Sequence, residues 1–245
     1  MRLRFARGLK VKITTIICFA NSRKHQGRCV AGKAIDAPHS WLRPIATAER
    51  TNLLEDEIRC SPKPRPLDIL SIPLKHPAQS SCQTENWIVD RSTPWELCGR
   101  VGWNKAQELV DKPSVMFSGT EHYGGANDRI PNALAKAFDS SIRLIYVPNV
   151  KILVEKGDNV ARSGKNDKKL KAEFFHASRS GGKLYTISIT DTDIERRFID
   201  YPVGTRKPLG EALICVSLSE PFAPNNLRRH YRFLLAAAII LKDEA

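Results

Sequence analysis

The residues best suited to chemistry in this sequence are cationic and polar side chains gathered in one short segment. Asn21, Ser22, Arg23, Lys24 and Arg28 lie within eight consecutive positions. Arginine and lysine bind phosphate, while asparagine and serine add hydrogen bonds to phosphates or to base edges. The segment therefore predicts contact with a polyanion. Two alternatives remain open: a solvated turn held by Asn21, or an ion pair from Arg23 or Arg28 that fixes the local fold.

Six further side chains extend this predicted contact. An exposed tryptophan would stack on a base, and cations beside it would bind phosphate or the ring face. For Trp41, which adjoins Leu42, burial in a core is the alternative. For the lysines of the charged stretch 157–171, the alternative is a solvated hairpin loop. The six residues are Lys33, Trp41, Arg43, Lys165, Lys168 and Lys169.

The charge of the chain makes nucleic acid the first partner to expect. The formal net charge is +13 over 245 residues. Residues 1–50 contain eleven Lys and Arg but only two acidic residues, Asp36 and Glu49. Such an asymmetry predicts a basic N-terminal face that contacts DNA or RNA. Aromatic residues make up only 7% of the chain, which favours recognition of backbone and shape, including that of a duplex, over base stacking.

The sequence contains no local signature of a catalytic, metal or cofactor site. It has no C-x-x-C pair, no H-E-x-x-H and no phosphate-binding Gly-rich Lys motif. Asp191, Asp193 and Glu195 are better explained as acids at a helix start than as metal ligands. We therefore expect a non-catalytic protein without metal or cofactor. A nuclease-type enzyme with a dispersed site, and an adaptor that docks a partner enzyme, are the alternatives.

The cysteines and apolar runs predict a cytoplasmic protein without a membrane span. The six cysteines lack the spacing of a zinc site, and a chain of this length can build a core without disulfides. The start of the chain has the charge of a signal peptide, but no small-x-small cleavage site follows. The apolar run at 233–241 is shorter than the ~20 residues that a membrane helix needs.

Hydrophobic patterning predicts a mainly β protein with some helix. Alternating and β-branched runs predict four or five strands in residues 1–92 and five or six in residues 140–245. A helix is expected from Trp95 to Val110, and another after Asp191 as its N-cap. The closing run at 231–240 fits either a strand or a helix. We expect two small barrels, 1–92 and 140–245, joined by a mostly helical insert at 93–139. One large sandwich is the alternative.

Several segments resemble the bacterial dual OB-containing domain family. They run in order from about Ile13: NSRKHQGRCVAGK, WLRPI, LDILSIPL, YTISITD and ICVSLSEPF. This resemblance, rather than periodicity, implies that both small barrels are OB-like. It also implies an accessory protein of a bacterial anti-phage defence system, with a protein partner encoded nearby. It supplies no catalytic residues, and the first ten residues lie outside it.

Overall fold

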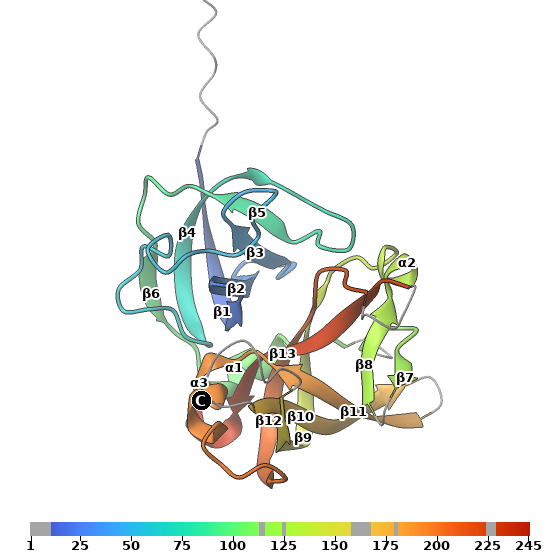
Figure 1. Ribbon diagram of the computed structural model, residues 1–245. Coiled ribbons are helices and arrows are strands. Elements are labelled where there is room, and N and C mark those ends of the chain that lie inside the picture. Colours follow the sequence, from blue (N-terminus) through green and yellow to red (C-terminus); the bar gives the residue numbers. More distant parts are fainter. Residues whose placement is uncertain (1–10, 113–115, 124–125, 158–167, 179–180, 224–228) are drawn as a thin grey trace, which may run out of the picture.

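The fold is dominated by strands, as the patterning predicts. A computed structural model describes residues 11–112, 116–123, 126–157, 168–178, 181–223 and 229–245. Of the described residues, 55% are in strands and 9% in helices. Figure 1 shows two groups of strands, the N-terminal one in blue to green and the C-terminal one in yellow to red. The mainly β class is therefore confirmed.

The N-terminal strands form a closed five-stranded barrel. β1 pairs with β2, β2 with β3, β3 with β5 in parallel, β5 with β4, and β4 returns to β1. The sixth strand extends this sheet beyond β4. The order β1-β2-β3-β5-β4 is that of an OB-type Greek-key barrel. The bounds are β1 Lys12–Lys24, β2 Gly27–Ala34, β3 Trp41–Ile45, β4 Asp68–Pro77, β5 Asn86–Val89 and β6 Glu96–Arg100.

The C-terminal strands repeat the same order. β9 pairs with β10, β10 with β11, β11 with β13 in parallel, β13 with β12, and β12 with β9. The closing run at 231–240, for which the sequence left strand and helix open, is therefore a strand, the fifth of a second ring. Two short strands extend this sheet from β13. The bounds are β7 Glu121–Tyr123, β8 Ala126–Pro131, β9 Ile142–Lys156, β10 Lys168–Ser178, β11 Gly181–Ile189, β12 Arg206–Leu218 and β13 Tyr231–Leu241.

The mostly helical insert at 93–139 is not confirmed. This segment contains strands β6, β7 and β8 and two short helices, α1 Trp103–Glu108 and α2 Asn132–Ala135. The helix expected from Trp95 begins later because Glu96–Arg100 forms ladder hydrogen bonds with β4 instead. Gly99, at φ 153°, suits that strand and disfavours a helix. The remaining helices are α3 Thr192–Phe198 and the 3-10 turn Lys242–Glu244.

Helix α3 begins where the sequence predicts it. The Asp191 carboxylate accepts hydrogen bonds from the backbone N–H groups of Asp193 at 2.9 Å and Ile194 at 3.2 Å, which makes it the N-cap. Its second oxygen accepts from the backbone N–H of Ile239 on β13 at 2.8 Å. Burial nevertheless raises the pKa of Asp191. The carboxylate therefore ties α3 to the barrel wall and is committed to structure.

Side chains of β1 alternate between the core of the first barrel and the contact with the second barrel. Ile16 and Cys18 point into the first barrel, whereas Ile17 and Phe19 point outward into a second apolar cluster. That cluster includes Leu213 on β12, other side chains of β9, β12 and β13, and residues of α1. The outer face of β1 and β2 is therefore packed against the second barrel.

Candidate ligand cleft between the two barrels

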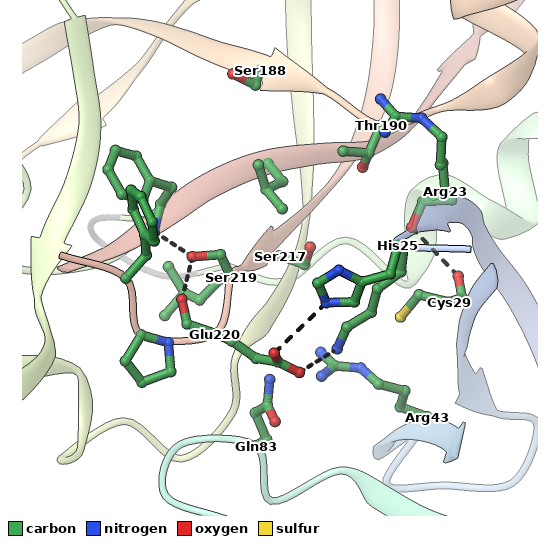
Figure 2. A pocket seen from close by; sticks show the side chains of 17 residues that line it. Arg23, His25, Cys29, Arg43, Gln83, Ser188, Thr190, Ser217, Ser219 and Glu220 are labelled. Atoms are coloured by element: carbon green, nitrogen blue, oxygen red, sulfur yellow. Dashed lines mark hydrogen bonds and ion pairs between the residues drawn. The ribbon is translucent and has the colours of Figure 1, made fainter. Parts of the chain in front are cut away.

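A cleft of about 490 Å³ opens where the barrels meet. One wall comes from the end of β1, its turn into β2, and β3. The other comes from β11, β13 and the loop after β12. Figure 2 shows the side chains of both walls directed toward a common space. The volume lies in the range of small-molecule sites, roughly 300–1,000 Å³.

The first wall carries three basic side chains. Arg23, Lys24 and His25 line it, with side-chain exposures of 55%, 18% and 70%, and Arg23 forms an ion pair with Glu195 of α3 at 2.6 Å. They stand at the tip of a hairpin in which β1 and β2 stay paired to Lys24 and Gly27. His25 completes the turn at φ 51°. Gly27 is needed there, because a Cβ at this position would lie 2.2 Å from the Leu53 carbonyl oxygen.

The second wall combines hydroxyl and apolar side chains. On β11, Ile187 and Ile189 point into the barrel, so Ser188 and Thr190 face the cleft. The wall continues with Ser217, Ser219, Phe222, Phe233 and Leu235. The Phe222 side chain is 56% exposed, and its ring centroid lies 6.2 Å from that of Phe233. Such a wall can bind a flat, partly apolar group and donate hydrogen bonds around it.

Glu220 bridges the two walls at the rim. Its Oε1 lies 2.9 Å from Lys24 Nζ and accepts a hydrogen bond from the Thr51 hydroxyl at 2.8 Å. Its Oε2 lies 3.8 Å from His25 Nε2 (Figure 2). Partial burial tends to raise the pKa of Glu220, but Lys24 and Thr51 outweigh it and lower the value to about 2. The carboxylate is therefore charged throughout the neutral range.

Arg43 reaches the cleft from a buried position. Its Nη2 lies 2.7 Å from Glu85 Oε1 and donates to the Ser141 hydroxyl at 2.9 Å. Burial opposes the positive charge, but the facing Glu85 outweighs it and the pKa of Arg43 is raised. Its Nε is buried and has no hydrogen-bond partner. Arg43 thus links the barrels and is also one of the residues that line the cleft (Figure 2).

Lys33 and Trp41 are committed to the contact between the barrels. Lys33 is 5% exposed, and its Nζ lies 2.6 Å from Asp111 Oδ1. Trp41 Nε1 donates to Asp111 Oδ2 at 3.1 Å, and its ring packs edge-on against Phe19. For Trp41 the structure thus favours the burial alternative over stacking on a base. The face of β2 and β3 that carries these residues is covered by the second barrel.

The remaining residues of the first predicted cluster divide between cleft and scaffold. Ser22 lines the cleft beside Arg23 and Lys24. Asn21 donates from Nδ2 to the Pro64 carbonyl at 2.8 Å. Arg28 pairs with Glu55 and donates to the Thr192 hydroxyl at 2.8 Å. Asn21 and Arg28 are not among the residues that line the cleft, and their contact with nucleic acid stays a prediction.

The expected loop at 157–171 is shorter than predicted. β10 begins at Lys168, because Leu170 and Ala172 alternate inward and pair with β9. Lys168 Nζ donates to the carbonyls of Ile199 at 3.1 Å and Tyr201 at 2.9 Å. Lys169 Nζ lies 3.9 Å from a Glu155 carboxylate oxygen. Lys165 lies outside the described residues.

Sequence reasoning missed most of the second wall. Ser217, Ser219, Glu220 and Phe222 stand in the segment SLSEPF, which contributes to the family resemblance but has no functional motif. His25 and Gln83 on the first barrel also line the cleft, and no sequence motif predicts them. Only proximity in the folded chain identifies all these residues, because strands about 200 positions apart form the two walls. A pattern along the chain cannot show it.

Neither a group of metal ligands nor a membrane-spanning helix is found among the described residues. There, no group of three or more His, Cys, Asp or Glu side chains is placed to hold a metal ion. No helix among these residues is both long enough and apolar enough to cross a membrane.

The repeated strand order agrees with a known family. A family model described as a dual OB-containing domain matches residues 14–239. The chain belongs to the dual OB-containing domain family. No curated protein matches it. A solved structure described as the tetrameric p202 HIN2 is 8% identical, covers 94% of this chain and 92% of that chain, and superposes with a TM-score of 0.29.

In this dual OB-containing chain the cleft lies where loops of both barrels meet that correspond to the ligand-binding loops of other OB barrels. OB barrels bind ligands through strands 2 and 3 and the loops between strands 1 and 2 and between strands 4 and 5. In the first barrel those loops contribute His25 and Gln83. In the second barrel, the corresponding loop between β12 and β13 contributes Ser219, Glu220 and Phe222. Its third strand, β11, contributes Ser188.

Proposed function

We propose that this dual OB-containing chain is a non-catalytic accessory protein that binds nucleic acid in the cleft between its barrels. The observation that carries the proposal is the convergence of three OB loops on one cleft with a cationic wall and a hydroxyl and apolar wall. Phosphates would contact Arg23, Lys24 and His25 of the basic N-terminal segment. Bases would lie against Phe222. This chemistry fits the two parts of a nucleotide.

The size of the cleft favours a single strand. The space of about 490 Å³ would hold a short part of a single strand, and a duplex would have to lie across its opening. The exposed Phe222 offers one face for stacking. The low aromatic content of the sequence favours recognition of backbone and shape, including that of a duplex. The exposed ring of Phe222 beside basic side chains instead favours a single strand of DNA or RNA.

The biological setting is proposed from the family alone. The resemblance implies a bacterial protein that acts beside a partner in anti-phage defence, and the cysteines favour the cytoplasm. The proposal that the cleft binds nucleic acid does not depend on this setting.

The test measures binding of labelled single-stranded DNA, single-stranded RNA and duplexes at two salt concentrations. R23A/K24A should weaken binding of a single strand and lower the slope of log K against log salt by about 0.7 for each phosphate that the variant no longer neutralises. The matched control is K105A/K242A, which removes two exposed cations paired with Glu108 and Glu211. Equal binding by the two double variants would contradict the site.

The same assay separates the alternatives. Cleavage of a strand on addition of Mg²⁺ or Mn²⁺ would support the nuclease-type alternative. Preference for a duplex would move the contact from the cleft to an outer face. If none of the oligonucleotides binds, capture of a partner protein in high salt after nuclease treatment would support the adaptor.

A further inference from the structure

Glu220 occupies a position in the cleft where an anion meets several donors. Lys24 Nζ lies 2.9 Å from its Oε1, the Thr51 hydroxyl donates to the same oxygen at 2.8 Å, and His25 Nε2 lies 3.8 Å from Oε2. Lys24 Nζ also donates to the Thr51 hydroxyl, which orients it. The donors all come from the first barrel, while the carboxylate comes from the second.

A phosphate has the same requirements as this carboxylate. Both present oxygen acceptors with negative charge, and both gain from ammonium and hydroxyl donors. Lys24 is only 18% exposed, and its ammonium group is directed at Thr51 and Glu220. A ligand phosphate that takes the place of the carboxylate beside Lys24 and Thr51 would compete with Glu220.

The surroundings of Glu220 supply the rest of a nucleotide site. Phe222 follows two residues later and is 56% exposed. Ser217 and Ser219 carry hydroxyl groups along the same wall. On the opposite side, Arg43 is 2% exposed and its Nε has no hydrogen-bond partner. A buried donor without a partner is uncommon in folded proteins.

We propose that Lys24, His25 and Thr51 form a phosphate subsite, that Glu220 closes it in the free protein, and that a nucleotide phosphate displaces Glu220 when it binds. This inference rests on the proposed function and adds the position of the phosphate and its competitor. The displaced carboxylate moves to solvent, which it already meets at 47% exposure. The base then lies beside Phe222. The phosphate belongs to a strand or to a free nucleotide, since the chemistry is the same.

Removal of the charge at position 220 should open the subsite. Glu220→Gln keeps an acceptor for Thr51 but loses the attraction to Lys24. Binding of oligothymidylate should tighten about fivefold, because an exposed ion pair contributes up to about 1 kcal/mol. Glu211→Gln is the matched control. It makes the same change in net charge at a carboxylate paired with Lys242 at 3.0 Å and not among the residues that line the cleft.

The experiment uses the full chain with two probes, an oligothymidylate strand and free thymidine monophosphate, in isothermal titration. Tighter binding by E220Q than by E211Q supports the subsite. The probe whose affinity increases identifies the source of the phosphate. Thermal unfolding checks the fold. If E220Q unfolds at a lower temperature, E220D repeats the test, because its shorter side chain withdraws the charge from Lys24. The same tightening is expected.

The remaining outcomes overturn the inference in distinguishable ways. If the parent binds the strand and E220Q binds like E211Q, the subsite is wrong and the proposed function stands. If E220Q weakens binding, Glu220 organises the cleft rather than closing it. If neither the parent nor E220Q binds either probe, both the subsite and the proposed function fail.

Discussion

Arg43 and Glu85 form an ion pair with 2.7 Å between Nη2 and Oε1, and their side chains are only 2% and 1% exposed. The Ser140 hydroxyl donates to the same carboxylate at 3.2 Å, and the Ser141 hydroxyl accepts from Arg43 at 2.9 Å. These serines immediately precede β9, whereas Arg43 is on β3. The pair therefore connects the two barrels directly behind the cleft.

Replacing Arg43 should destabilise the protein strongly. Arg43→Ala leaves the Glu85 charge buried without its partner, which costs about 3–5 kcal/mol in other buried pairs. Urea unfolding measures the free energy. Lys105→Ala, which breaks the exposed pair with Glu108, should change it by about 0.5 kcal/mol or less. A decrease below about 1 kcal/mol for R43A would mean that Glu85 finds other compensation.

Two exposed phenylalanines distinguish the cleft from the outer face of the second barrel. Phe222 is 56% exposed in the cleft, and Phe175 is 65% exposed on β10. Phe222→Ala should weaken binding of a single strand by about 1–3 kcal/mol, the usual contribution of one stacked base. Phe175→Ala should leave it unchanged in the same anisotropy assay. The reverse result would place the strand on β10 and β11, outside the cleft.

Glu57 makes stability sensitive to acid. Hydrogen bonds from Arg50 and Arg91 lower the pKa of Glu57 from 4.5 to about 2. A lowered pKa stabilises the folded chain above pH 4.5, and this contribution disappears as pH falls toward 2. We expect it to be about 2 kcal/mol, since Arg50 and Arg91 are partly solvated.

The check is urea unfolding at pH 7 and pH 3. Glu57→Gln should lose less stability between the two pH values than the parent chain. Glu108→Gln, at an exposed pair on α1, should follow the parent. An equal decrease in all three chains would assign the acid sensitivity to other carboxylates.

The cysteines should differ sharply in reactivity. Burial raises the pKa of Cys18 to about 12 and that of Cys215 well above 9, and the thiolate is the reactive form. Cys98 is exposed, and Cys29 lines the cleft at intermediate exposure. Iodoacetamide followed by mass spectrometry should modify Cys98 first and leave Cys18 and Cys215 intact. Bound oligonucleotide should slow modification of Cys29 but not of Cys98.

Local features of the fold were predictable from the sequence. Asp191 as a cap, the strand at Trp41–Ile45 and the alternation of β11 follow from short-range chemistry. The helix expected from Trp95 was not, because pairing of Glu96–Arg100 with β4 outweighs local propensity. The closure of the second ring by β11 and β13 joins residues nearly fifty positions apart, and no local pattern specifies it.

The candidate site was predictable only on one side. Ser22, Arg23 and Lys24 do line the cleft. Lys33 and Arg43 were predicted to contact nucleic acid because their side chains are basic, but Asp111 and Glu85 hold them in buried ion pairs. The sequence contains these carboxylates without indicating their partners. Phe222 and Glu220 became visible as site residues only once the barrels were placed together.

The outward residues of β1 tie the folding of one barrel to the other. The Arg23 N–H donates to the Thr190 carbonyl at 2.8 Å, and Ser22 bridges to Asp191. Ile17 and Phe19 would lose their packing against β9, β12 and β13 if residues 1–139 were made alone. The first barrel therefore cannot complete its surface until the last strand is synthesised. Unfolding should be a single cooperative transition, and folding should be slow, because contacts that span nearly the whole chain must form before either half is stable.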